Sequence, residues 1–248
     1  MDTIDKLLAK PYIQNSSDKI QEKLKFLATK APGYIANLLE RPETFPGGKI
    51  LAITNIYFDP EKSIFGIITY FDVMNDAGKK FNYQYFGWKQ GPNSGTKSLI
   101  VFVNEIEGKM RCTHIGFIEK FKFAPGKVML DLAGGFSESG EITDETLRRE
   151  LEEELGITAE DIVESILLGR VMTDAGITNN HPNIAVVLVK PKNREKFESH
   201  VDTDQDTFQG TFKVYPWEVL PTLIATNDDG LFLAAIARAQ IALHNYIP

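Results

Sequence analysis

One amphipathic helix constrains this chain more than any other feature of its sequence. Thr143 is a suitable N-cap for this helix, acidic residues follow in its first turn, and Gly156 ends it. Between them, Leu147, Leu151 and Leu155 recur every four residues, so at about 100° per residue they share one face. An apolar stripe of this kind packs on another element, which predicts a helix laid against a sheet.

Three glutamates, Glu150, Glu153 and Glu154, lie on the arc beside that stripe, because they are three and four residues apart. Like charges at this spacing repel one another, and a bound cation removes the repulsion. Carboxylate oxygens suit magnesium, which also bridges carboxylates to substrate phosphates. The helix therefore predicts a site for Mg²⁺, with Mn²⁺ as a substitute. A solvated acidic face is the alternative interpretation.

The residues around this helix follow a fixed spacing. Gly135 is followed after five residues by Glu141, and after seven more by Arg149 and the run that ends at Ile157. Every fixed position of the Nudix signature is matched, namely Gly, Glu, Arg-Glu-aliphatic, Glu-Glu, Gly and aliphatic. The sequence thus resembles the Nudix hydrolase superfamily. The resemblance implies a pyrophosphohydrolase, a magnesium-dependent hydrolase acting on phosphorus-containing anhydrides.

The resemblance also implies a role for each matched residue. Glu150 and Glu154 match the principal metal ligands, and Glu153 matches an additional ligand or a base. These three glutamates are the candidate catalytic and metal-binding residues. Arg149 and Glu141 match a pair that orients the helix and the preceding loop, which is a structural role rather than a catalytic one.

Outside the signature, residues 118–135 look like the corresponding segment of ADP-ribose and nucleoside diphosphate sugar pyrophosphatases. Those enzymes usually carry Arg where Lys120 or Lys122 stands, and Glu-aliphatic-Pro-Ala-Gly where this chain has Asp-Leu-Ala-Gly-Gly. Residues 173–178 resemble their Ser-Pro-Gly loop, again without the proline. This branch implies hydrolysis of the pyrophosphate in ADP-ribose or a nucleotide sugar, with release of a nucleoside monophosphate.

A small set of residues is expected to bind the substrate. Gly134 and Gly135 let the backbone pass close to a phosphate, because they have no side chain. Lys120 and Lys122 alternate with phenylalanines, so both face one way; either one of them neutralises a phosphate, or both face solvent. Trp88 either stacks on a nucleobase or simply packs in the protein.

The general base is left open between a glutamate of the helix and an acid from a loop. Asp202, Asp204 and Asp206 lie in a polar stretch between expected strands and could swing over the site. Asp174 is a further candidate. Solvated loop acids are the alternative interpretation for all of these aspartates.

Hydrophobic periodicity changes along the chain and predicts three parts. Residues 1–48 are predicted to form a helical N-terminal extension, residues 49–95 a small antiparallel β domain, and residues 96–248 the Nudix catalytic domain. Strands joined by hairpins and mixed with helices indicate the α+β class. With the resemblance, the expected fold is a Nudix α/β/α sandwich with a small preceding β-sheet domain. In the resembled branch the small sheet mediates dimerisation, so we expect a homodimer by analogy.

Composition disfavours several other classes of protein. The single cysteine, Cys112, rules out an intramolecular disulfide, which suits the reducing cytoplasm. No apolar run approaches the roughly 20 residues of a membrane span, and the N-terminus lacks a signal-peptide pattern, so we expect a cytoplasmic protein without a membrane partner. A net charge of -7 without a basic cluster disfavours nucleic acid and leaves a small nucleotide as the expected partner.

Two alternatives to the expected activity stay open. A Nudix-derived binding module could sense a nucleotide without cutting it, although such modules usually lose one of the helix carboxylates, and this chain keeps all three. A Nudix hydrolase could also act on dinucleotides, oxidised nucleoside triphosphates or capped RNA, because the signature specifies the bond that is cut and not the groups attached to it.

Overall fold

The structure is a computed structural model, and the chain divides into two compact units. The N-terminal unit comprises Met1–Ser94 and Met172–His181, and the C-terminal unit comprises Gly95–Val171 and Pro182–Pro248. The residues that the structure describes are 2–62, 66–92, 95–138, 141–190, 194–198, 200 and 210–246.

Four helices open the N-terminal unit: α1 (Thr3–Leu8), α2 (Pro11–Gln14), α3 (Asp18–Lys30) and α4 (Pro32–Glu40). Prolines begin α2 and α4, at a position where the missing backbone N–H has no partner to lose. In α3, Ile20, Leu24 and Leu27 recur at helical spacing and are buried. The helical pattern expected before residue 48 is therefore present.

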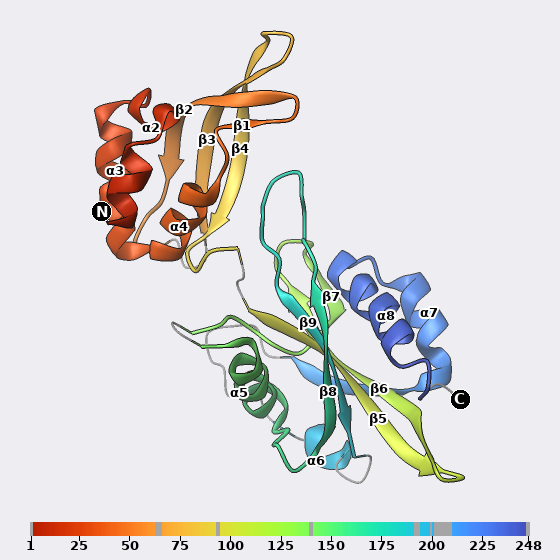
Figure 1. The fold of residues 1–248 in the computed structure, drawn as a ribbon. Coiled ribbons are helices and arrows are strands. Elements are labelled where there is room, and N and C mark those ends of the chain that lie inside the picture. Colours follow the sequence, from red (N-terminus) through yellow and green to blue (C-terminus); the bar gives the residue numbers. More distant parts are fainter. Residues whose placement is uncertain are drawn as a thin grey trace. The chain divides into compact units, whose positions relative to one another are not determined.

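A small antiparallel sheet follows in the order β1-β2-β3-β4, built from β1 (Thr44–Phe45), β2 (Gly48–Tyr57), β3 (Gly66–Asn75) and β4 (Lys80–Trp88). The four helices lie on one side of this sheet (Figure 1). Ile53, Phe71 and Tyr85 of the sheet are buried in one hydrophobic cluster with Leu24 and Leu38 of the helices. The sequence predicted an extension beside a β domain; in the structure helices and sheet share one core.

The second stretch of the N-terminal unit lies along β4. The Phe86 amide donates a hydrogen bond to the Ile177 carbonyl at 2.8 Å. The Asn179 side chain donates to Asn37 Oδ1 and accepts from the Tyr85 hydroxyl, both at 2.6 Å. Residues 172–181, far from the rest of this unit in the sequence, thus belong to it. Hydrophobic periodicity does not predict this contact between distant segments.

The C-terminal unit is built on a six-stranded sheet. The strands run in the order β10-β6-β5-β9-β8, and β7 pairs with the end of β6. Strands β5 and β9 are parallel, and the other neighbours are antiparallel. Their bounds are β5 (Thr96–Ile106), β6 (Lys109–Lys122), β7 (Lys127–Asp131), β8 (Ile162–Arg170), β9 (Asn183–Val189) and β10 (Thr211–Pro216).

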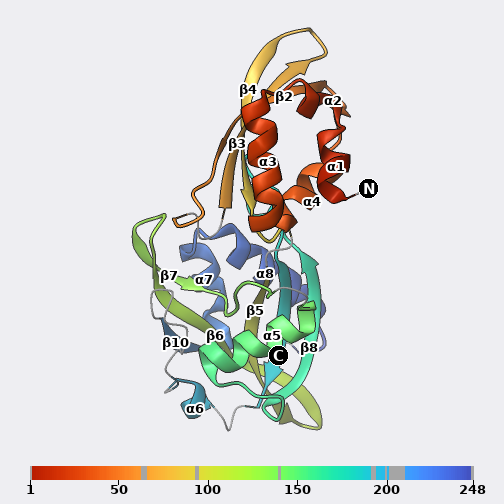
Figure 2. The same ribbon diagram turned by 90° about the vertical axis from the view of Figure 1, so that its left-hand side faces the viewer.

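Helices cover both faces of this sheet (Figures 1 and 2). On one face Ile100 and Phe102 of β5 share a core with α5, and on the other Leu99 and Val101 share a core with α8. Side chains alternate between the two faces of a strand, so one apolar run serves both cores. The α+β prediction, with an α/β/α sandwich and a small preceding sheet, is confirmed. The helices are α5 (Thr143–Leu155), α6 (Arg194–Glu198), α7 (Leu220–Thr226) and α8 (Gly230–Ala242), with a 3₁₀ turn, η2 (Trp217–Val219), before α7.

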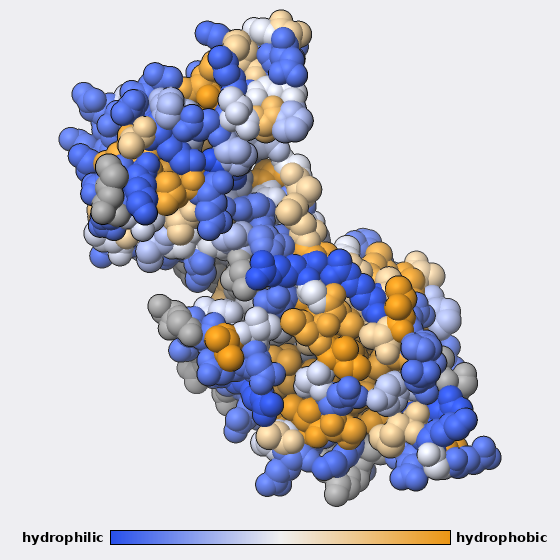
Figure 3. All heavy atoms as spheres, in the orientation of Figure 1, coloured by the Kyte–Doolittle hydropathy of each residue, from blue (hydrophilic) through white to orange (hydrophobic). Residues whose placement is uncertain are grey.

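Strand β8 forms one edge of the larger sheet, and hydrophobic side chains gather on the face of the C-terminal unit where it lies (Figure 3). Val163 and Leu167 of this strand are exposed, as is Ile241 of α8. Within the described residues, no helix is both long enough and apolar enough to cross a membrane.

Candidate active site

Helix α5 carries the predicted carboxylates. It begins at Thr143, so the N-cap is Ile142 and not Thr143 as the sequence predicted. The Ile142 amide donates to the Glu145 carboxylate at 3.1 Å, which satisfies one of the N–H groups at the start of the helix. Gly156 ends the helix in the left-handed conformation at φ 64°, as expected.

The apolar stripe of α5 holds the helix on the sheet. Leu147, Leu151 and Leu155 are buried in the same cluster as Ile100 and Phe102 of β5. This packing fixes which arc of the helix faces the core, and therefore where the neighbouring acidic arc lies. The stripe inferred from the sequence thus anchors the candidate site.

The three glutamates on the acidic arc differ in exposure. The side chains of Glu150 and Glu154 are 12% and 9% exposed, whereas that of Glu153 is 44% exposed. Burial, together with the nearby Glu154 and Glu153 carboxylates, raises the pKa of Glu150 to about 7, although Arg149 opposes the shift. Two nearly buried carboxylates therefore lie beside a third and repel one another. A bound divalent cation would remove this repulsion.

Arg149 binds the acidic arc to the loop before the helix. Its Nε and Nη2 donate to the two oxygens of Glu141 at 2.9 and 3.1 Å, and Nη2 also donates to the Phe136 carbonyl at 2.8 Å. Its Nη1 donates to Glu150 and Glu153 at 2.8 and 2.9 Å. The hydrogen bonds from Arg149 lower the pKa of Glu141 to about 2. This geometry is what an orienting pair requires.

Arg149→Lys is expected to destabilise the protein by about 2 kcal/mol and to reduce turnover by about 10- to 100-fold. A single ammonium cannot replace a planar group that holds Glu141 and the Phe136 carbonyl at once. Urea unfolding and steady-state kinetics measure the two effects. Arg148→Lys is the matched control, because Arg148 is exposed and forms its ion pair with Asp144 on the solvent side of the same helix. Equal effects of the two substitutions would contradict this role.

The glycines before the helix are in close contact with protein groups, and their expected approach to a substrate phosphate stays a prediction. A Cβ on Gly135 would lie 2.5 Å from Glu150 Oε2, so glycine lets this carboxylate keep its present position. Gly134 has φ +120°, and a Cβ there would lie 2.2 Å from the Thr96 carbonyl oxygen. The Gly134 amide donates a hydrogen bond to Glu154. Both glycines therefore place backbone against the acidic arc.

Lys120 and Lys122 face the same way, as their alternation predicts, and both reach the carboxylate of Asp131 at the end of β7. Lys120 also lies 3.7 Å from Glu154 Oε1. A third lysine, Lys97 of β5, joins them at 3.5 Å from Asp131. Lys97 was not among the residues predicted from the sequence. A lysine at the start of a continuous apolar strand is the pattern that could have indicated it.

The remaining predicted residues do not belong to the described part of the C-terminal unit. Trp88 belongs to β4 of the N-terminal unit. Its ring packs edge-on against the ring of Phe86, with 5.4 Å between the ring centroids. Asp174 also belongs to the N-terminal unit, and its carboxylate accepts a hydrogen bond from the Gly176 amide at 2.8 Å, as a turn requires. The other candidate loop acids lie outside the described residues; they are Asp202, Asp204 and Asp206.

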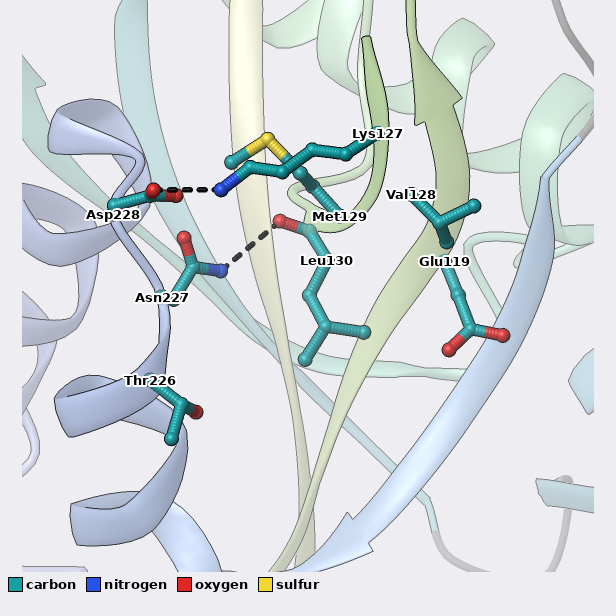
Figure 4. Close-up of a pocket in the computed structure, with 8 residues that line it drawn as sticks. All are labelled: Glu119, Lys127, Val128, Met129, Leu130, Thr226, Asn227 and Asp228. Atoms are coloured by element: carbon teal, nitrogen blue, oxygen red, sulfur yellow. Dashed lines mark hydrogen bonds and ion pairs between the residues drawn. The ribbon is translucent and has the colours of Figure 1, made fainter. Parts of the chain in front are cut away.

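A surface pocket of about 190 Å³ is lined in part by Glu119 of β6 (Figure 4). Neighbouring side chains of a strand point to opposite faces, so Lys120 lies on the other face of β6. Lys127 and Asp228 form an ion pair across the pocket at 2.7 Å, and the Asn227 amide donates to the Leu130 carbonyl at 3.2 Å. The lysine, the aspartate and the asparagine of this pocket are thus paired within the protein, and we assign the pocket no ligand. The pocket is lined by Glu119, Lys127, Val128, Met129, Leu130, Thr226, Asn227 and Asp228.

The donor set fits a hard divalent cation, although its oxygens do not converge on one point. Among the described residues no group of three or more histidines, cysteines or acids is arranged to hold a metal ion. The reason lies in the contacts above, because Arg149 holds Glu150 and Glu153 while the Gly134 amide holds Glu154. The set nevertheless consists of carboxylate oxygens crowded on one arc, which is the chemistry that magnesium binds.

Comparison with known proteins decides the family. The NUDIX domain family matches residues 97–234, more than half of the chain. The chain belongs to the Nudix family. The predicted superfamily and the predicted pyrophosphohydrolase enzyme are thereby confirmed, and the matched residues include α5 with its three glutamates.

Two solved structures are similar to this chain to different degrees. An "ADP compounds hydrolase" is similar with a TM-score of 0.55 and 14% identity, over 82% of this chain and 97% of that chain. A "mutT/nudix family protein from Listeria innocua" has a TM-score of 0.43 and 22% identity, over 60% of this chain and 94% of that chain. Among curated proteins, none matches this chain. At such identities the first structure supports the fold alone.

Proposed function

We propose that this Nudix hydrolase cuts the pyrophosphate bond of a nucleoside diphosphate linked to another group, with ADP-ribose or a nucleotide sugar as substrate. Water attacks one phosphorus, the bond from that phosphorus to the bridging oxygen breaks, and a nucleoside monophosphate leaves with a phosphorylated partner. The observation that carries the proposal is the acidic arc of α5, where Glu150 and Glu154 are nearly buried beside Glu153.

Mg²⁺, with Mn²⁺ as a substitute, would be held by Glu150, Glu154 and Glu153. When bound, the cation screens the diphosphate, stabilises charge on the leaving phosphate and makes water more acidic. Arg149 must then share Glu150 and Glu153 with the cation, because it donates to both. Its contacts to Glu141 and the Phe136 carbonyl remain to hold the loop in place.

The chain's own residues supply orientation and proton transfer. Glu153 is the most exposed of the three carboxylates; its two alternative roles are a further ligand of the cation and a base that takes a proton from water, and its exposure suits the second. Lys122 is more exposed than Lys120, at 29% against 13%, and is the better placed to meet a phosphate of the substrate. Gly134 and Gly135 keep the backbone beside these groups free of side chains. A loop acid as base remains the alternative.

Two likenesses make this substrate class the first one to test. Residues 118–135 resemble the corresponding segment of ADP-ribose and nucleotide-sugar pyrophosphatases. The solved structure whose similarity extends over 82% of this chain is that of an "ADP compounds hydrolase". Dinucleotides, oxidised nucleoside triphosphates and capped RNA are the other substrates to compare. A homodimer through the small sheet and a cytoplasmic location stay predictions.

A panel of nucleotides tests the substrate class. We expect purified protein with Mg²⁺ to convert ADP-ribose or a nucleotide sugar to a nucleoside monophosphate at least about 100-fold faster than dinucleotides, oxidised triphosphates or capped RNA. Chromatography of the phosphate products measures the rates. Removing the cation with a chelator should stop the reaction. A compound that binds tightly and survives intact would favour the non-hydrolytic sensing module instead.

A further inference from the structure

Lys97 occupies a place where a lysine is costly. It stands at the start of β5, between the buried residues Thr96 and Ser98, and its side chain is only 20% exposed. An ammonium group this far from water loses hydration, which its protein partners must replace. The groups that it binds therefore indicate why it is there.

The partners of Lys97 lie at the end of β7 and in the segment that joins β7 to α5. Its Nζ lies 3.5 Å from Asp131 Oδ2, donates to the Leu132 carbonyl at 3.3 Å and donates to the Gly134 carbonyl. An ammonium has three N–H donors, so these three oxygens satisfy it completely. One lysine on β5 thus holds three points of the segment that leads into the acidic helix.

Gly134 links Lys97 to the candidate site. Its carbonyl accepts from Lys97, and its amide donates to Glu154 Oε2. A backbone hydrogen bond also connects this segment to β5, because the Ser98 amide donates to the Ala133 carbonyl at 2.7 Å. A single residue therefore stands between the buried ammonium and a carboxylate proposed to hold the cation.

The charges around Asp131 keep Lys97 in place. Burial alone would raise the pKa of Asp131, but Lys97, Lys122 and Lys120 together bring this pKa well below its usual range. Asp131 is therefore ionised throughout the working range of pH. All three lysines contact Asp131, and Lys97 is the one that also donates to the Gly134 carbonyl, which gives it a distinct place in this cluster.

We infer that Lys97 is a positioning residue, which holds the Gly134 backbone so that its amide fixes the Glu154 carboxylate for a divalent cation. The inference rests on the proposed function, because it assigns Glu154 to the cation. Lys97 acts through the backbone and touches neither the cation nor the substrate. A lysine that only supported the fold would affect stability without affecting cation affinity in the folded protein.

Lys97→Met in the full-length protein tests this inference. We expect Mn²⁺ binding, followed by electron paramagnetic resonance, to weaken about tenfold, and kcat with Mg²⁺ to fall about 10- to 100-fold while KM changes less than about twofold. Lys190→Met is the matched control, because Lys190 also donates to a backbone carbonyl, that of Glu160 at 2.6 Å. The control should match the wild type in both measurements.

Lys97→Arg keeps the charge beside Asp131 and serves if the methionine variant does not fold. A planar guanidinium is larger than an ammonium and cannot donate from one atom to both the Leu132 and the Gly134 carbonyl. We therefore expect Mn²⁺ affinity and kcat to fall at least about threefold, with the unfolding midpoint unchanged. Wild-type Mn²⁺ affinity and kcat in a folded Lys97 variant would overturn the inference. Glu154→Gln in the same assays separates the two claims, because wild-type values there would overturn the proposed function itself.

Discussion

Replacing Glu154 with glutamine is expected to reduce turnover by about 10³-fold, equivalent to about 4 kcal/mol of transition-state stabilisation, with the fold retained. The side chain is 9% exposed and accepts a hydrogen bond from the Gly134 amide. Glutamine has the same shape and keeps an oxygen for this hydrogen bond, so the packing of α5 should persist. It lacks the charge that a divalent cation requires of its ligand.

The measurement for this variant is the rate of nucleoside monophosphate release with Mg²⁺, alongside its thermal unfolding midpoint. Glu152→Gln is the control on the same helix, because Glu152 is exposed and points away from the acidic arc. The control should keep wild-type turnover. Wild-type turnover in the Glu154 variant would remove this helix from the chemistry, whatever the fold of the protein.

Gly134→Ala is expected to destabilise the protein by at least about 3 kcal/mol and to reduce turnover at least about tenfold. The backbone of Gly134 has φ +120°, which side-chain-bearing residues rarely adopt, and a Cβ would lie 2.2 Å from the Thr96 carbonyl oxygen. Moving either the Gly134 backbone or the Thr96 carbonyl to make room for the Cβ would cost free energy of folding. Any shift of this residue also moves the amide that binds Glu154.

Gly126→Ala provides the comparison for the glycine prediction. Gly126 also has a positive φ, +68°, but nothing lies within 4 Å of an added Cβ. We expect a loss of only about 1 kcal/mol there, with turnover unchanged. Urea unfolding of both variants gives the difference. Equal losses in the free energy of unfolding for the two variants would show that the close approach at Gly134 does not contribute to stability.

The parts of the site that lie within one local pattern could be predicted from the sequence. The spacing of Leu147, Leu151 and Leu155 gives the face of α5 that packs on the sheet, and the glutamates follow from the same helical geometry. Arg149 and Glu141 could be paired because they belong to one signature. Helical spacing does not show that Arg149 also bonds to Glu150 and Glu153, because a side chain's direction depends on its partners.

The contacts that the sequence did not predict connect distant segments. Lys97 and Asp131 meet because the start of β5 lies beside the segment after β7, a tertiary contact that no local pattern encodes. The same holds for Asn179, whose amide meets Asn37 on a helix near the start of the chain. Helical periodicity predicted the first helices but could not show that they share a core with the small sheet.

The most direct test of the central claim is an anomalous difference map from crystals of this protein soaked in Mn²⁺. If the acidic arc of α5 holds divalent cations, the map will show a peak about 2.1 Å from carboxylate oxygens of Glu150 and Glu154, with the contact between Arg149 and Glu150 rearranged. A protein that hydrolyses its nucleotide with Mn²⁺, but whose map shows no peak beside α5, would contradict the claim.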